Sequence, residues 1–441
     1  MRTELEFTMT QIESTMPRMN LIIAVAAALA LAACARDRAP EFKPAQELSV
    51  AGDVGTAPMF AVSPGGTEAA AWVSAPNGGT DGRLYIAVNG ATPVELRDTL
   101  GPIEPHGESP PKLAYSPDGA LNALYVVTRL EPGRRFPAAA LRFVRSTDGG
   151  AHWTTPVNVT DDSTWGSHNF ETLFAGHDGA LYASWLDGRQ GKSTVYMTRS
   201  TDGGKTWSPN LQVFSGEACP CCRTTMASAP DGSLYLAWRR VFPGNVRDIV
   251  VAKSTDRGAS WQEPVRAHAD NWVFDGCPHA GPSLQVDDKG RVHIAWWTGK
   301  QGSAGVWYAR SDDAGRTFGT PVPLGVAEFS RPAHVQLALG GQERLIAAWD
   351  DGTLATPRIV VRTSRDGGST WSGPATLSDS GKVAGFPVVA AHGERMSVAW
   401  SQQRSSAPQH DMHMDMKDPN MKMPLSAVGD AQVLVRRGTL E

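Results

Sequence analysis

The chain has 441 residues, of which 41% are hydrophobic and 14 are tryptophan, a composition that suits a large β core. Its 45 acidic and 41 basic side chains give a formal net charge of −4 with no basic stripe, so nucleic acid is not an expected partner. No helical pattern of any length follows residue 34, and a single large domain can hold nearly all of the remaining chain.

The first residues are typical of an export signal. An apolar run over residues 21–30 is too short to span a bilayer comfortably, and it leads into Leu31-Ala32-Ala33-Cys34. That ending resembles the bacterial lipobox, which implies a lipoprotein signal peptide over residues 1–34, lipidation of Cys34 and a polar tether over residues 35–45. Residue 35 is Ala rather than Asp, so we expect an exported protein that is lipid-anchored in the cell envelope, at the outer membrane, facing the periplasm or the surface. An ordinary signal peptide cut near Ala33 is the alternative.

Five nearly identical eight-residue segments recur at intervals of 54, 54, 57 and 53 residues. They are STDGGAHW from Ser146, STDGGKTW from Ser200, STDRGASW from Ser254, SDDAGRTF from Ser311 and SRDGGSTW from Ser364. Each follows a strand-like run, and its Asp can accept backbone N–H groups of its own turn while the following Gly takes a positive φ. We therefore predict a structural role for five aspartates: Asp148, Asp202, Asp256, Asp313 and Asp366.

The pattern Ser-x-Asp-x-Gly-x-x-aromatic resembles the Asp box of the sialidase-like, BNR-repeat β-propeller superfamily. A second motif has the same period: a small apolar strand that ends at Trp72, Trp185, Trp238, Trp296, Trp349 and Trp400, with Leu124-Tyr125-Val126-Val127 as its counterpart in the second repeat. Four short strands per repeat of about 55 residues are the content of one propeller blade.

These counts predict an all-β, seven-bladed β-propeller over residues 46–441, with six blades as the alternative because most sialidase-like propellers have six. The last blade ends at residues 433–436 with no room for a fourth strand, whereas a spare strand occupies residues 47–50. We expect that N-terminal strand to complete the last blade and close the ring, which leaves no open sheet edge.

Four further cysteines lie in two clusters, Cys219, Cys221 and Cys222 in ACPCCRTT and Cys277 in DGCPHAGPS, where His279 follows two residues later. Both clusters occupy the connection from one blade to the next, so we expect them to be neighbours in space. One interpretation is that one or two disulfides brace adjacent blades, as is common in exported proteins. The other is a thiolate and imidazole site for copper or zinc.

Between Trp400 and the last strand, a loop insertion over residues 401–430 contains HDMHMDMKDPNMKM. It shows no apolar period, so a low-complexity surface loop is one interpretation. The other is copper binding, because thioethers and imidazoles are ligands of Cu(I) and Cu(II). The candidate ligands in this loop are His410, Met412, His413, Met414 and Met416.

In an antiparallel blade, the blade-to-blade connections and the loops between the second and third strands open on the same end of the ring. Both cysteine clusters and the Met/His loop are therefore predicted to share one end of the channel. Several basic side chains are expected there as well: His106, His168, His334, Arg134, Arg135, Arg223 and Arg331.

The resemblance to sialidases implies three arginines that clamp a carboxylate, a Tyr–Glu nucleophile and an Asp acid/base. The stretch where the first arginine is expected, residues 54–60, contains none. Arg223 and Arg331 could contribute to an anion clamp and Glu108 could act as a general base, but this set is not specific.

The sequence therefore favours an envelope-anchored, monomeric binding protein whose ligand is a metal ion, with copper as the candidate metal, or a small molecule or glycan, with a lipid anchor as its contact with the membrane. Whether the protein is an enzyme stays open, with binding favoured over catalysis, and an exo-glycosidase of the sialidase type is the first alternative. A protein-interaction scaffold with disulfide-braced loops is the second.

Overall fold

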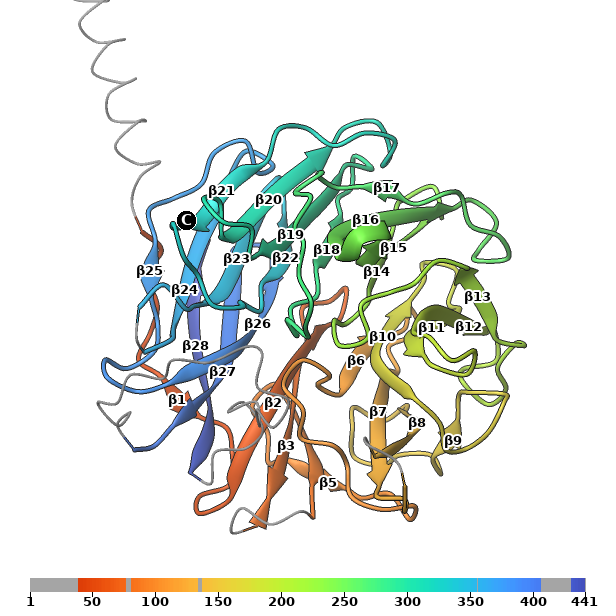
Figure 1. The fold of residues 1–441 in the computed structure, drawn as a ribbon. Coiled ribbons are helices and arrows are strands. Elements are labelled where there is room, and N and C mark those ends of the chain that lie inside the picture. Colours follow the sequence, from red (N-terminus) through yellow and green to blue (C-terminus); the bar gives the residue numbers. More distant parts are fainter. Residues whose placement is uncertain (1–38, 77–80, 134–136, 355, 406–429, 441) are drawn as a thin grey trace, which may run out of the picture.

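The computed structural model describes residues 39–76, 81–133, 137–354, 356–405 and 430–440, and these form seven four-stranded antiparallel sheets arranged as blades of one ring (Figure 1). The predicted count of seven blades is confirmed, and the six-bladed alternative is wrong. The predicted signal peptide and Cys34 lie outside the described residues. Within the described part, no helix is long and apolar enough to cross a bilayer.

Each of the first six blades contains four consecutive strands. Their bounds are β2 (Val54–Val62), β3 (Glu68–Ala75), β4 (Arg83–Val88) and β5 (Val94–Leu96); β6 (Lys112–Tyr115), β7 (Leu121–Arg129), β8 (Ala138–Ser146) and β9 (Val157–Asn158); β10 (His168–Ala175), β11 (Leu181–Asp187), β12 (Thr194–Ser200) and β13 (Leu211–Phe214); β14 (Thr225–Ser228), β15 (Leu234–Phe242), β16 (Val246–Ser254) and β17 (Val265–Arg266); β18 (Ser283–Val286), β19 (Val292–Thr298), β20 (Gly305–Ser311) and β21 (Val322–Val326); β22 (Gln336–Gly341), β23 (Arg344–Asp351), β24 (Arg358–Ser364) and β25 (Ala375–Thr376). A short 3-10 turn, η2 (Pro243–Asn245), joins β15 to β16.

The seventh blade joins the two ends of the chain. It contains β26 (Ala384–His392), β27 (Arg395–Gln403), β28 (Ala431–Thr439) and the N-terminal strand β1 (Gln46–Glu47), which pairs antiparallel with β28. The backbone N–H of Leu48 also donates to the carbonyl of Val433 at 2.8 Å. The predicted closure is therefore confirmed, although β1 is shorter than the strand predicted for residues 47–50.

The two repeated motifs have separate positions in each blade. The tryptophans that end the second strands lie in the core, and Trp72, Trp185 and Trp400 are completely buried. The Asp boxes form the turns between third and fourth strands. In the box of Asp256, for example, Oδ1 accepts hydrogen bonds from the Ser254 hydroxyl at 2.8 Å and from the Ser260 N–H at 2.9 Å. The hydroxyl of Ser260 donates to Oδ2 at 2.5 Å, and this bond, with the two to Oδ1, lowers the pKa of Asp256 to about 2 and closes the turn.

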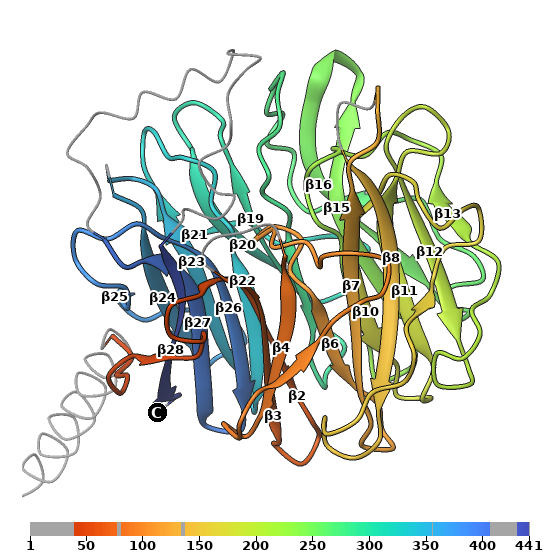
Figure 2. The same cartoon turned by 90° about the horizontal axis from the view of Figure 1, so that it is seen from below.

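Strand direction separates the loops into two faces. The blade-to-blade connections and the loops between second and third strands lie at one end of the ring, which we call the cysteine face. The Asp boxes and the turns between first and second strands lie at the other end, which we call the Asp-box face. Figure 2 shows the ring from the side, with the β15–β16 connection rising from the cysteine face at the top.

Candidate metal centre

Three buried thiols lie together in the connection between β13 and β14. The Sγ atom of Cys219 is 3.7 Å from that of Cys221 and 3.3 Å from that of Cys222, and all three sulfur atoms lie within 4.8 Å of one another. Each of the three side chains is at most 4% exposed. The second predicted cluster joins them, because the thiol of Cys277, in the connection between β17 and β18, hydrogen bonds with the thiol of Cys221. The structure thus brings the four cysteines together.

The backbone of the β13–β14 connection is held against its neighbours. The N–H of Cys219 donates to the carbonyl of Arg239 in β15 at 2.8 Å, and the N–H of Ala218 donates to the carbonyl of Ser193 at 2.9 Å. At the other end of the segment, the N–H of Thr224 donates to the carbonyl of Phe170 in β10. The segment that carries the thiols is therefore held between two blades: it bonds to β15 of the blade that follows it and to β10 of the blade that precedes it. The local sequence alone does not position the thiols.

Two buried guanidinium groups give the cluster a positive environment. Arg247 Nη1 donates to Cys219 Sγ at 3.1 Å, and Arg239, which is 1% exposed, also stabilises a charge on that sulfur. Hydrogen bonds from Cys221 and Cys222, together with these two cations, lower the pKa of Cys219. Burial raises the pKa of Cys221 and of Cys222, so the negative charge belongs on Cys219.

No disulfide links these four cysteines or any other part of the described chain. The disulfide bracing considered from the sequence is therefore not formed in this structure. Three sulfur atoms separated by less than 5 Å, with a fourth beside them, are instead close to the arrangement of a thiolate metal site, because zinc–sulfur bonds of about 2.3 Å place neighbouring sulfur ligands about 4 Å apart.

His279 lies next to the cysteines with a defined orientation. Its Nδ1–H donates to the carbonyl of Cys277 at 3.1 Å, which leaves Nε2 free to accept a proton or a metal ion. The residue has a φ of 48°, in the left-handed region that is uncommon for residues other than glycine. The ring lies near that of His106, with the two centroids 5.8 Å apart, and near that of Phe170 at 6.3 Å.

Glu108 ties the two cysteine-bearing connections together. This carboxylate is 0% exposed; its Oε1 accepts the N–H of Arg223, directly after Cys222, at 3.2 Å and the N–H of Gly281 at 2.6 Å. Its Oε2 forms an ion pair with Arg223 Nη1, while Arg223 Nη2 donates to the carbonyl of Val335 at 2.7 Å. Glu108 is thus a structural link rather than a free general base, and Arg223, which is 4% exposed, is not available to clamp an anion.

Other predicted residues are distributed around this centre. His334 lies in the connection before β22 and donates from Nδ1 to Asp350. His168 Nε2 lies 3.2 Å from Asp162 and 3.8 Å from Asp187, but the guanidinium of Arg189 binds both carboxylates, so we assign no metal to this group. Arg331 is half-buried, and Arg134 and Arg135 lie outside the described residues.

The candidate ligands of the Met/His loop, His410, Met412, His413, Met414 and Met416, also lie outside the described residues. The two ends of the loop are among the described residues. Gln402, near the end of β27, pairs with Ala384, the first residue of β26, so the loop leaves the ring at the cysteine face. The predicted common face therefore holds for the points where the loop is attached.

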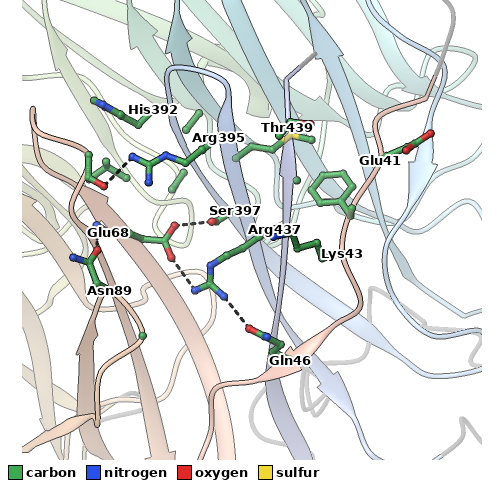
Figure 3. A pocket seen from close by; sticks show the side chains of 18 residues that line it. Glu41, Lys43, Gln46, Glu68, Asn89, His392, Arg395, Ser397, Arg437 and Thr439 are labelled. Atoms are coloured by element: carbon green, nitrogen blue, oxygen red, sulfur yellow. Dashed lines mark hydrogen bonds and ion pairs between the residues drawn. The ribbon is translucent and has the colours of Figure 1, made fainter.

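A separate cavity of about 720 Å³ lies on the Asp-box face, where the seventh blade meets the first (Figure 3). Its polar groups largely satisfy one another: Glu68 forms an ion pair with Arg437 at 3.0 Å and accepts the Ser397 hydroxyl at 2.6 Å. Arg437 also donates to Gln46 of β1. These contacts hold the closing strand to the ring, so we assign the cavity to the ring closure.

Sequence reasoning missed the roles of Glu108, Arg239 and Arg247. The sequence contains one indication of the role of Arg239, because this residue directly follows Trp238 in the second-strand motif and must therefore lie next to the core. The cation it contributes beside the thiols depends on contacts from outside its own strand, with the carbonyls of Ala280 and Trp297.

These features define the class of the protein as a seven-bladed, Asp-box β-propeller with a cluster of thiols on its cysteine face. Residues 104–273 match the family model described as a BNR repeat-like domain. No curated protein sequence matches the chain.

Several solved structures are similar. A polysaccharide lyase described as an ulvan lyase is 13% identical with a TM-score of 0.54, and the match covers 80% of this chain and 93% of the lyase. The α-L-arabinofuranosidase of Fusarium graminearum is 14% identical with a TM-score of 0.50, over 77% and 96% of the two chains. A Hadza microbial sialidase is 17% identical with a TM-score of 0.47, over 75% and 73%. At such identities, the likeness to the lyase and to the arabinofuranosidase shows a shared fold and nothing about the reaction.

Proposed function

We propose that the protein binds a thiophilic metal ion, foremost Cu(I), through Cys219, Cys221, Cys222 and Cys277 on the cysteine face. The observation that carries this proposal is the convergence of four thiols from two blade connections, three of them buried and within 4.8 Å of one another. Soft thiolates favour Cu(I) and Zn(II) over harder cations.

The charges around the cluster fit this ligand set. Three or four thiolates around one Cu(I) carry a net charge of −2 or −3, and such a charge is costly in a buried site unless cations compensate it. Arg247 donates to Cys219, and Arg239 lies beside it. Because the pKa of Cys219 is lowered whereas those of Cys221 and Cys222 are raised, metal binding releases protons from Cys221 and Cys222, so affinity should rise with pH.

The test is a competition between the purified protein and bicinchoninate for Cu(I) under reducing conditions. We expect tight binding, with a dissociation constant below micromolar, and its loss when Cys219, Cys221 and Cys222 are replaced by Ser. His152→Ala is the matched control, because this side chain is 90% exposed in an Asp box at the other face. Binding no tighter than micromolar in the unsubstituted protein would refute the proposal.

The Met/His loop is proposed as a second source of copper ligands, through His410, Met412, His413, Met414 and Met416. The support is that both ends of the loop are attached at the cysteine face. Replacing these five residues with Ala should lower the copper stoichiometry without changing the affinity of the thiol cluster.

We also propose that the protein is a monomer anchored through a lipid on Cys34, with its Asp-box face toward the membrane. The support is the path of the described N-terminal residues: Phe42 pairs with Gly438, near the Asp-box end of β28. This arrangement leaves the cysteine face directed away from the membrane. Cys34→Ser should release the protein from the membrane fraction and abolish labelling with radioactive palmitate.

The alternative function is an exo-glycosidase, which draws on the fold shared with an arabinofuranosidase. The positions of Glu108 and Asp350 do not favour glycosidase activity, because the two carboxylates lie on opposite edges of the imidazole of His334. Both are less than 10% exposed, so they are not placed to flank a glycosidic bond. Release of 4-methylumbelliferone from a panel of glycosides tests this alternative, and we expect none.

A scaffold with disulfide-braced loops, the remaining alternative, requires oxidised cysteines, and counting thiols by mass with and without reductant separates it from the metal site.

A further inference from the structure

One of the seven gaps between neighbouring blades differs from the others. In five gaps, the aromatic side chain that ends an Asp box packs against the core cluster joining the two blades; these side chains are Trp153, Trp207, Trp261, Phe318 and Trp371. Phe42 of the N-terminal segment packs against the cluster between the sixth and seventh blades. Among the described residues, the cluster between the seventh and first blades has no aromatic side chain from a turn or from the N-terminal segment.

The sequence of the first blade explains this difference. Its turn between β4 and β5, Asn89-Gly90-Ala91-Thr92-Pro93, is not an Asp box and supplies no aromatic side chain. The cavity of about 720 Å³ lies at this gap, and Asn89 and Gly90 line it (Figure 3). Its volume falls within the range of pockets that bind small ligands, about 300–1,000 Å³.

Two side chains beside the cavity are placed to donate hydrogen bonds to the same ligand group. His392 and Arg395 are partners across the β26–β27 hairpin, so their side chains lie next to each other on one face of the blade. A Cβ atom on Gly66 would lie 2.6 Å from Arg395 Nη2 and 3.0 Å from His392 Nε2. The two nitrogen atoms therefore border one small space, which is open because Gly66 has no side chain.

The guanidinium of Arg395 has no carboxylate partner among the described residues. It makes one long hydrogen bond, from Nη2 to the carbonyl of Gly66 at 3.4 Å. The adjacent Glu394 pairs with Arg344 instead, at 3.0 Å. Arg395 thus keeps donors for a ligand, and the planar guanidinium group is suited to phosphate and carboxylate oxygens. Basic side chains outnumber carboxylates in the lining of the cavity, with Lys43, Arg395 and Arg437 against Glu41 and Glu68.

The path of the N-terminal segment indicates where such an anion comes from. Residues 41–43 line the cavity, and Cys34 lies seven residues before Glu41. Seven residues span at most about 25 Å, so a lipid on Cys34 keeps the cavity close to the membrane surface and its phosphate groups. Apolar side chains also line the cavity, among them Val62 and Met396, and these suit the carbon atoms next to a lipid phosphate.

We propose that this cavity binds the phosphate group of an anionic membrane phospholipid, with Arg395 and His392 as donors and Gly66 leaving room for the phosphate oxygens. The inference rests on the proposed lipid anchor and adds a second contact with the membrane, which fixes the orientation of the ring. It assigns a binding role to the Asp-box face that is independent of the thiol cluster.

The test is co-sedimentation with phosphatidylcholine vesicles that either contain or lack phosphatidylglycerol. The protein is the chain from residue 35 onward, which contains all seven sheets but neither Cys34 nor the apolar run over residues 21–30. We expect binding only to vesicles with phosphatidylglycerol. Arg395→Gln should lower this affinity about fivefold, the typical contribution of one basic side chain at an anionic membrane. Arg316→Gln is the matched control, because this exposed arginine belongs to an Asp box on the same face and does not line the cavity; it should lower the affinity less than about twofold.

Gly66→Ala tests the geometry of the site without changing its charge. The added methyl group would displace the Arg395 guanidinium and the His392 ring, so the affinity should fall as far as with Arg395→Gln. Gly119→Ala is the control, because Gly119 lies in the corresponding turn of the second blade. Both glycines have a φ of 83°, but a Cβ on Gly119 would meet no atom within 4 Å. Circular dichroism should show similar unfolding temperatures for the two variants, and only Gly66→Ala should weaken vesicle binding.

Several results would overturn the inference: no binding to phosphatidylglycerol vesicles, equal losses with Arg395→Gln and Arg316→Gln, or equal affinities of Gly66→Ala and Gly119→Ala. Binding of glycerol phosphate in solution without binding of the vesicles would overturn the assignment to a membrane lipid. The proposed anchor fails separately. If Cys34 carries no lipid but the vesicles are bound through Arg395, the anchor alone is refuted; if Cys34 carries a lipid and the vesicles are not bound, this inference alone is refuted.

Discussion

Glu108→Gln is the substitution that tests most directly how the cysteine face is built. The side chain of Glu108 accepts two backbone N–H groups, from Arg223 and Gly281, and forms an ion pair with the guanidinium of Arg223. Glutamine has nearly the same shape and keeps an oxygen as acceptor, but it removes the negative charge. The guanidinium of Arg223, only 4% exposed, then remains buried without its counterion.

The expected loss is large for one substitution. Removing one partner of a buried ion pair typically costs 3–5 kcal/mol, and the hydrogen bonds that glutamine retains place the value near the lower limit, at about 3 kcal/mol. At about 2.1 cal/mol/K per residue, a domain of about 400 residues unfolds with an entropy of about 0.8 kcal/mol/K, so the thermal midpoint should fall by about 4 °C. The Cu(I) affinity should fall as well, because the two cysteine-bearing connections lose their common link.

Differential scanning calorimetry of Glu108→Gln measures the midpoint, with Glu343→Gln as the control. Glu343 also contacts two basic side chains, Lys289 and Arg291, but it lies on the surface, where an ion pair contributes at most about 1 kcal/mol. The control should therefore shift by about 1 °C or less. A Glu108→Gln midpoint within 1 °C of the unsubstituted protein would show that the carboxylate does not hold the connections together.

Three other outcomes are expected. Gly204→Ala should destabilise the protein by about 2 kcal/mol or more in urea unfolding, because the residue has a φ of 83° and a Cβ there would lie 2.0 Å from Phe143. Gly319→Ala is the control: the nearest atom to a Cβ at that position is 3.5 Å away, so this substitution should leave the free energy of unfolding nearly unchanged. In the metal-free reduced protein, iodoacetamide should modify the exposed Cys277 first, and Cu(I) should block this reaction; equal rates with and without Cu(I) would exclude Cys277 as a ligand. Burial and the nearby Glu171 raise the pKa of Glu104 to about 7, so its native state keeps a proton that the unfolded chain loses above about pH 4.5. Its contribution to stability should thus decline from about pH 4.5 to 7 and stay low above, and Glu104→Gln should raise the midpoint at pH 8 but not at pH 4; no difference between the two pH values would contradict the raised pKa.

The amino-acid sequence by itself determined the blades. Each blade is a local unit of four short strands whose turn residues and buried tryptophan repeat with a nearly constant period, so the count of seven and the closing role of the N-terminal strand followed from spacing alone. The same topology placed the two cysteine clusters and the attachment points of the Met/His loop on one face.

Only the tertiary structure decided which side chains of the innermost connections meet. Glu108 reaches partners 115 and 173 residues away in the sequence, Arg223 and Gly281, and no local pattern encodes these contacts. The position of Arg239 beside the thiols also depends on residues distant in sequence, because carbonyl groups of a neighbouring blade fix its guanidinium. The repeat period and the turn conformations depend on residues close in sequence. Contacts between the innermost connections depend instead on how tightly the seven blades pack around one axis.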